Sequence, residues 1–129
     1  DRQFIRKVLP LAKKKGVGTV CFKTFGGGKL VGDTEGYNQP LKLRPRGKIS
    51  SGGSRATPLL PHLDPDECVH YTLTCDPDVA LLGLSFPVEQ DQAFAAALRF
   101  KPLSPARMAR IRRRAVAAIA RKGPCWWNP

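Results

Sequence analysis

The sequence predicts an α/β fold in which helices alternate with two short parallel strands. Two apolar runs bounded by glycine, proline or aspartate, at 17–23 and 78–84, are typical of strands buried in a parallel sheet. Helical patterns precede and follow each run, which indicates βα units. Two strands cannot cover their own edges, so the pattern is that of the last quarter or third of a larger α/β protein.

Composition favours one folded domain over a nucleic-acid-binding chain. The 129 residues are 42% hydrophobic, which is enough for a core. The net charge is +12, but the basic residues gather in three segments, 13–15, 42–55 and 107–122, without the interleaved aromatic residues that base stacking requires. Solvated basic faces are therefore favoured, and nucleic acid is not an expected partner.

No targeting or membrane signal is evident. No apolar run reaches the ~20 residues of a membrane span, and no charged-then-apolar leader opens the chain. The four cysteines, Cys21, Cys68, Cys75 and Cys125, include no C-x-x-C pair and are not spaced for a shared metal. We expect reduced thiols, no metal, no membrane partner and a cytoplasmic location.

The first segment, 1–30, predicts a helix, a strand and a glycine loop. Apolar residues recur at helical spacing between 4 and 12, and Pro10 places the start of the regular helix about one turn before it. Lysines at 13–15 complement the helix dipole, and Gly16 ends the helix. A buried strand then carries the residues Val17, Val20, Cys21 and Phe22.

The strand runs into a glycine triplet, Gly26–Gly28. Three glycines remove every Cβ from the turn, so backbone N–H groups can approach a ligand, and phosphate is the usual one. A plain tight turn is the alternative interpretation. The next segment, 31–63, is rich in Gly, Pro, Ser, Arg and Lys and predicts a long loop, which either lines a site or is simply solvated.

The segment 64–122 predicts a helix, a strand and two further helices. Asp64 as N-cap and Pro65 at the first position start a helix that runs to about Cys75, with His70 as a surface or interface residue. After the strand 78–84, a helix begins near Pro87. Its expected apolar stripe is Val88, Ala93, Phe94, Ala97 and Leu98.

Ser104 and Pro105 start the last helix. One side of this helix carries Met108, Ile111, Ala115, Ala118 and Ile119, and its basic face carries Arg107, Arg110, Arg112, Arg113, Arg114 and Arg121. An aromatic tail, 123–129, completes what we treat as a single partial domain, 1–129. The chain opens at Asp1 directly in a helical pattern, which is expected for a piece of a longer protein.

Three motifs resemble the aldo-keto reductases. The run LPLAKKKGVG at 9–18, followed by FKTFGGGKL at 22–30, is similar to the sixth helix and seventh strand of that family. The run DVALLGLSFPVEQDQ at 78–92 resembles its eighth strand and the helix that follows, and FKPLSP at 100–105 resembles the lead into its late C-terminal helix. The resemblance implies that the chain is the C-terminal portion of a (β/α)₈ TIM barrel, with two parallel strands, flanking helices and an added C-terminal helix.

The resemblance also implies a cofactor, NADP(H), bound by loops after the two strands. The turn 24–28 would lie along the pyrophosphate. The loop 84–86 would lie near the adenosine 2′-phosphate, and Glu89 and Gln92 of the following helix near the adenine. The implied cofactor-binding residues are Thr24, Phe25, Gly26, Gly27, Gly28, Leu84, Ser85, Phe86, Glu89 and Gln92. The family often has a basic residue at 84–86 and Asn where Ala93 stands, so the choice between NADP and NAD stays open.

The family's catalytic Asp, Tyr, Lys and His lie in the first half of the barrel, and no residue of this chain is assigned as catalytic. The reaction implied is hydride transfer between NADPH and a small-molecule carbonyl substrate, with the remaining N-terminal half of the barrel as partner. Tyr37, Trp126 and Trp127 would line the substrate pocket, although outer-surface packing of the tryptophans is an equal alternative. Two other functions stay open: a non-catalytic basic anion- or nucleic-acid-binding module, and a half-barrel that assembles with a partner.

Overall fold

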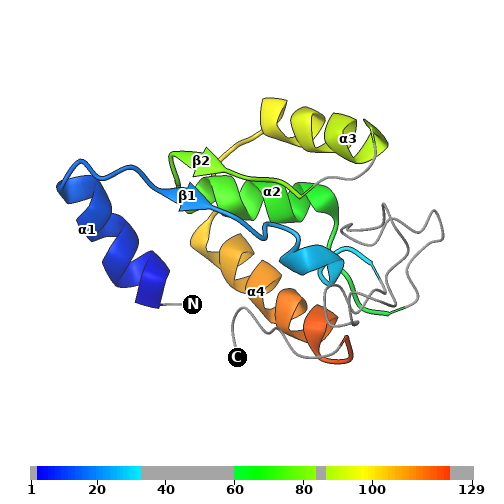
Figure 1. The fold of residues 1–129 in the computed structure, drawn as a ribbon. Coiled ribbons are helices and arrows are strands. Elements are labelled where there is room, and N and C mark those ends of the chain that lie inside the picture. Colours follow the sequence, from blue (N-terminus) through cyan, green and yellow to red (C-terminus); the bar gives the residue numbers. More distant parts are fainter. Residues whose placement is uncertain (1–2, 33–59, 84–86, 123–129) are drawn as a thin grey trace, which may run out of the picture.

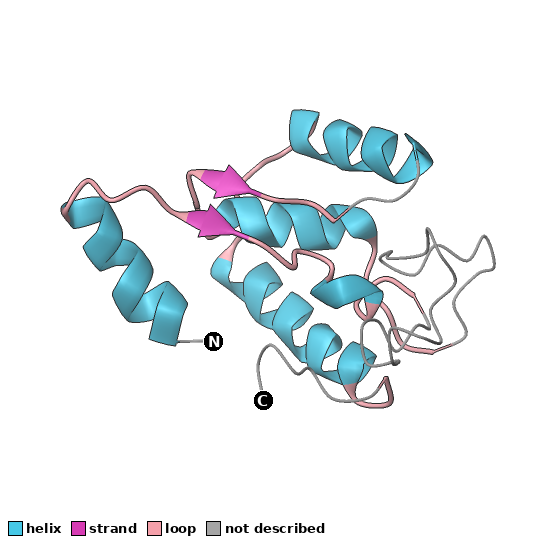
Figure 2. Ribbon diagram, viewed as in Figure 1, coloured by secondary structure: helices cyan, strands magenta, loops and turns pink. Residues whose placement is uncertain are grey.

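A computed structural model describes residues 3–32, 60–83 and 87–122 of the chain (Figure 1). The described part is mixed α/β, as predicted, with four α-helices and one two-stranded parallel sheet. Helix α2 lies behind the strand pair, between α3 and α4, while α1 stands to one side (Figure 2). The elements in chain order are α1 (Leu9–Lys14), β1 (Val20–Cys21), α2 (Pro65–Thr74), β2 (Val79–Ala80), α3 (Pro87–Leu98) and α4 (Pro105–Ile119).

The two strands pair in parallel, but they are much shorter than the runs that predicted them. Val20 is opposite Val79, and Cys21 is opposite Ala80. The Val79 N–H donates to Thr19 O at 3.0 Å and the Leu81 N–H donates to Cys21 O at 2.8 Å. Beyond this ladder Lys23 takes a left-handed φ of 63°, which ends the extended backbone of β1.

The prediction that both strands are buried is wrong for one face of the sheet. Val20 and Phe22 are 56% and 65% exposed, and their partners Val79 and Leu81 are also exposed. Side chains alternate along a strand, so these four form one face, while Cys21 and Ala80 point toward α2 and are half-buried. Among the described residues no helix packs over Val20, Phe22, Val79 and Leu81 (Figure 1). We call these four side chains the uncovered sheet face.

Helix α1 continues from a π-helical turn, Phe4–Val8, which the sequence did not indicate. Pro10 has no N–H to donate to the carbonyl of Arg6, four residues earlier, and the N–H of the preceding Leu9 donates to Phe4 O, five residues back, as in a π-helix. Gly16 ends the helix with a φ of 66°, as predicted. The last turn carries Lys13, which forms an ion pair with Asp76 just beyond α2.

Helix α2 has the predicted start and end. Asp64 is its N-cap, Pro65 its first residue and Cys75 its C-cap. Glu67 completes a capping box, because the Asp64 N–H donates to Glu67 Oε2 at 3.3 Å. Local sequence signals therefore fixed both ends of this helix.

The predicted stripe of α3 is wrong in most of its members. Ala93 is buried, but Phe94 and Leu98 are 57% and 89% exposed, Ala97 is exposed, and Ala96 is buried in their place. The side chain of Val88 lies outside the described residues. Small side chains at Ala93 and Ala96 let α3 approach α2 closely, and size rather than hydrophobicity selects the buried face.

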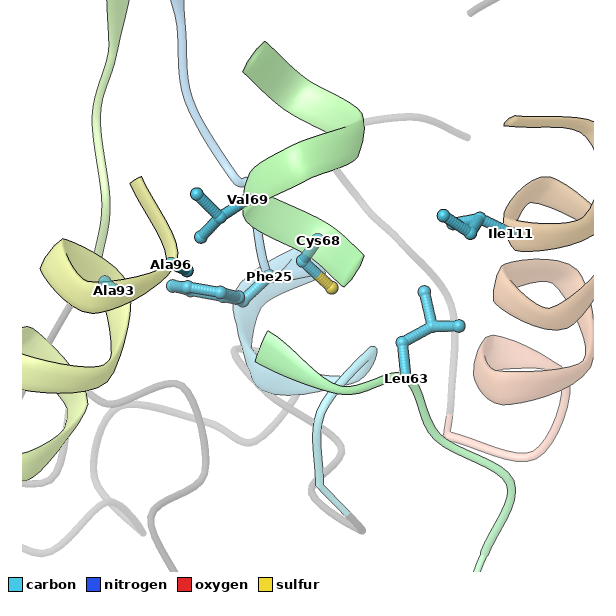
Figure 3. Close-up of a cluster of buried hydrophobic side chains, with 7 residues drawn as sticks. All are labelled: Phe25, Leu63, Cys68, Val69, Ala93, Ala96 and Ile111. Atoms are coloured by element: carbon cyan, nitrogen blue, oxygen red, sulfur yellow. The ribbon is translucent and has the colours of Figure 1, made fainter. Parts of the chain in front are cut away.

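The core lies between α2 and the segments around it (Figure 3). The ring of Phe25 points toward Val69 of α2 and toward the alanines of α3 (Figure 3). On α4, Ile111 and Ala118 are buried and Ala115 is half-buried, which confirms the predicted apolar side. The core cluster consists of Phe25, Leu63, Cys68, Val69, Ala93, Ala96 and Ile111.

Among the described helices, none combines the length and the apolar character that crossing a bilayer requires.

Candidate functional site

The candidate site is the edge of the sheet where β1 and β2 end side by side. Both strands run in the same direction, so their carboxyl ends meet at one edge. The Thr24 Oγ1 hydroxyl, just after β1, donates to Leu81 O, just after β2, at 3.5 Å. This contact brings the glycine turn after β1 next to the chain that leaves β2.

The turn itself is a 3₁₀ turn over Gly26–Gly28. All three glycines have left-handed backbone, with φ values of 60°, 64° and 92°. At Gly26 a Cβ would also lie 3.0 Å from Leu30 Cγ. Glycine is therefore required here by backbone conformation and, at Gly26, by a close side-chain neighbour.

Several groups of the turn already have partners within it. The Gly26 N–H donates to Lys23 O at 2.7 Å and the Gly28 N–H donates to Phe25 O at 3.0 Å. The Phe25 side chain is 6% exposed and belongs to the core. Gly28 is buried, so the turn presents the half-buried backbone of Gly26 and Gly27, and Thr24 beside it is 7% exposed.

The other predicted site residues are only partly described. Gln92 is exposed on α3, and Glu89 lies in the same helix although its side chain is outside the described residues. Leu84, Ser85 and Phe86, which follow β2, also lie outside them. So do the predicted substrate-pocket residues Tyr37, Trp126 and Trp127.

Lys122 is hydrogen-bonded to the backbone that follows the glycine turn. The sequence did not indicate this contact. The Lys122 side chain is 1% exposed, and its Nζ donates to Lys29 O at 2.8 Å and to Pro61 O at 2.9 Å. A lysine in the last turn before a glycine looks like an ordinary helix end, and no local pattern marks it as buried. The contact ties the end of α4 to the segment that follows the turn.

Glu67 forms a second cluster that the sequence did not reveal. Arg114 Nη1 donates to its two carboxylate oxygens at 2.5 and 2.7 Å, and Arg107 Nη2 donates at 3.2 Å. The carboxylate is 7% exposed, whereas both arginines are more than 40% exposed. Two of the six arginines of the predicted basic face therefore pair with a buried carboxylate.

The described thiols are poor nucleophiles. Burial and, to a smaller extent, the neighbouring carboxylates of Glu67 and Asp64 raise the pKa of the Cys68 thiol to about 12. Burial also raises the pKa of Cys21 and of Cys75. In the part of the chain that the structure describes, no three His, Cys, Asp or Glu side chains are grouped to hold a metal ion.

His70 lies at the interface between α2 and the end of α3. Its Nε2 is 2.8 Å from Ala96 O, and its ring meets Phe100 edge to face with centroids 5.7 Å apart. The imidazole therefore contacts both Ala96 O and the Phe100 ring, in agreement with the predicted interface role.

No protein-family model, no curated protein and no solved structure matches the chain.

Proposed function

We propose that the chain is the C-terminal, cofactor-phosphate-binding part of an aldo-keto reductase-like NADP(H)-dependent oxidoreductase. The observation that carries this proposal is the contact of the two strand ends, through Thr24 Oγ1 and Leu81 O. In open and closed α/β folds alike, ligands bind where the carboxyl ends of parallel strands meet. The motif resemblance assigns the cofactor to the same edge.

The backbone of the turn supports a phosphate as the group held there. Gly26 and Gly27 are left-handed and half-buried, so they present peptide backbone where a side chain would otherwise stand. Helix α3, which begins at Pro87, is the first described helix after β2, and the positive end of its dipole favours an anion. A dinucleotide pyrophosphate is the ligand that such an arrangement favours.

The uncovered sheet face supports the view that this unit is one part of a larger barrel. Val20, Phe22, Val79 and Leu81 present apolar side chains to solvent over adjacent strands. Burying them contributes about 25 cal/mol for each Å² removed from water. The N-terminal half of a (β/α)₈ barrel would cover this face and pair with the strand edges.

In this proposal the chain positions the cofactor, and the groups that act on the substrate lie in the N-terminal half of the barrel. NADP(H) supplies the hydride for a small-molecule carbonyl or accepts it from an alcohol. The residues that would hold it are Thr24 and the glycine turn, with the loop 84–86, Glu89 and Gln92 at the adenosine end. No proton donor is assigned within the described residues.

The test is a fluorescence titration of the natural protein that contains this sequence with NADPH. We expect saturable binding, competed by free pyrophosphate at higher concentration. Absence of a saturable signal from that protein would contradict the proposal. A parallel titration with NADH measures how much the 2′-phosphate contributes to the affinity for NADPH.

A further inference from the structure

A cavity of about 400 Å³ lies between the π-helical turn at the N-terminus, α2 and α4. Its volume falls in the range of pockets that hold small organic molecules. Of the predicted cofactor-binding residues that the structure describes, its wall includes only Thr24. The cavity is thus largely separate from the glycine turn.

Most of the wall is apolar. Leu30, Leu63 and Ile111 line it, together with Ala115 of α4 and Ile5 of the π-helical turn. Leu63 and Ile111 are 1% and 2% exposed and belong to the core. A hydrocarbon body in this space would therefore contact side chains already held in place by the core packing.

The remaining wall carries positive charge and hydroxyl groups. Arg6 lines the cavity from the π-helical turn and Arg112 lines it from α4. Both arginines are exposed, and neither forms an ion pair with a carboxylate of the described residues. Tyr71 and Thr72 of α2 add two hydroxyl groups that can donate to an oxygen anion.

We propose that this cavity binds an amphipathic monoanion, an aliphatic or aromatic carboxylate whose hydrocarbon part lies among the core residues. Arg112 and Arg6 would donate to the carboxylate, since guanidinium groups match its two oxygens in geometry and charge. A cation of the same shape would meet two like charges, and a neutral analogue would leave both guanidinium groups without a partner. The assignment does not depend on the proposed function.

The experiment is isothermal titration calorimetry of the whole chain with decanoate and, in parallel, with decylammonium. Decanoate should bind saturably at one site, and decylammonium at least about tenfold more weakly. Equal affinity for the two, or no saturable binding of decanoate, would overturn the proposal. This comparison needs no variant and is therefore independent of any change in folding.

Two exposed arginines on α4 provide a matched pair of variants. Arg112 lines the cavity, whereas the next residue, Arg113, does not. Arg112→Gln should weaken decanoate binding about tenfold, and Arg113→Gln should change it less than about twofold. Equal weakening of decanoate binding by both variants would show that decanoate is attracted by the overall positive charge of α4, and it would overturn the proposed site. Ala115→Leu, which fills the cavity, should abolish binding while the circular dichroism spectrum stays that of the wild type.

Discussion

Arg114 and Glu67 join α4 to the first turn of α2 across 47 positions of sequence, with Arg114 Nη1 at 2.5 and 2.7 Å from the two carboxylate oxygens. The carboxylate also accepts from Arg107 Nη2 and from the Asp64 N–H. Glu67 is almost fully buried, so these donors replace the water that the charge has lost. The glutamate that completes the capping box of α2 therefore also fixes where α4 packs.

This arrangement predicts that Glu67 contributes far more to stability than its neighbour Asp66. Glu67→Gln should lower the free energy of unfolding by about 1–3 kcal/mol, because the buried negative charge and one of the two acceptor oxygens are lost. Asp66→Asn should cost about 0–1 kcal/mol, since its pair with Arg99 is exposed on both sides. Urea denaturation of both variants measures the difference. A cost for Asp66→Asn equal to that of Glu67→Gln would contradict the role given to Glu67.

Asp78, which immediately precedes β2, makes a pH-dependent contact. Thr19 Oγ1 and the Thr19 N–H donate to Asp78 Oδ2 at 2.7 and 2.6 Å, and these hydrogen bonds lower the pKa of the Asp78 carboxyl. Thr19→Val removes the larger of the two effects, so the pKa of Asp78 should rise toward the ordinary value of about 3.9. Carboxyl-carbon NMR titration measures it. Thr24→Val, which does not touch Asp78, is the control and should leave this pKa unchanged.

The lowered pKa of Asp78 determines the direction in which folding stability changes with pH. A carboxyl whose pKa is lower in the folded state stabilises the fold above its unfolded pKa and loses that contribution as pH falls through the folded pKa. The stability difference between wild type and Thr19→Val should therefore be constant above about pH 4.5 and shrink below about pH 3.9. A difference that grew on acidification would contradict the assignment.

Cys68 should be the slowest of the described thiols to react. It is 3% exposed, and its pKa is raised to about 12, so almost no thiolate is present at neutral pH. Iodoacetamide labelling followed by mass spectrometry should modify Cys21 and Cys75 first and Cys68 only after urea unfolds the chain. Labelling of Cys68 as fast as Cys21 in the native protein would show that the core opens locally.

Lys122 should be a structural residue despite its charge. Lys122→Met leaves the buried Lys29 carbonyl and the Pro61 carbonyl without this donor and should cost about 1–3 kcal/mol of unfolding free energy. Lys101→Met, at an exposed position, is the matched control and should change stability by less than about 0.5 kcal/mol. Thermal unfolding monitored by circular dichroism distinguishes the two.

Local signals predicted the helices of this chain well. The Asp64–Pro65 start of α2, the Ser104–Pro105 start of α4 and the Gly16 stop after α1 depend on capping chemistry within a few residues, so one sequence suffices to find them. Ser104 Oγ accepts from the Arg107 N–H at 3.3 Å, as such a cap requires.

Features that depend on distant partners were not predictable in the same way. Phe22 and Leu81 look buried by composition, but exposure of a strand face depends on what packs over it, and no local pattern records that. The selection of Ala96 over Leu98 on α3 is likewise decided by how closely α2 approaches. The Glu67–Arg114 and Lys122–Lys29 contacts join positions far apart in sequence, and each residue alone reads as a surface charge.

The central claim is that the glycine turn holds a cofactor phosphate. Its most direct test is the dissociation constant of NADPH, measured for two single glycine variants of the natural protein. Gly27 has a φ of 64°, whereas Gly18 has no left-handed backbone and an added Cβ there would meet nothing within 4 Å. Gly27→Ala should weaken NADPH binding about tenfold or more, and Gly18→Ala should leave it within about twofold. Equal NADPH affinity in the two variants, with both folded, would contradict the claim.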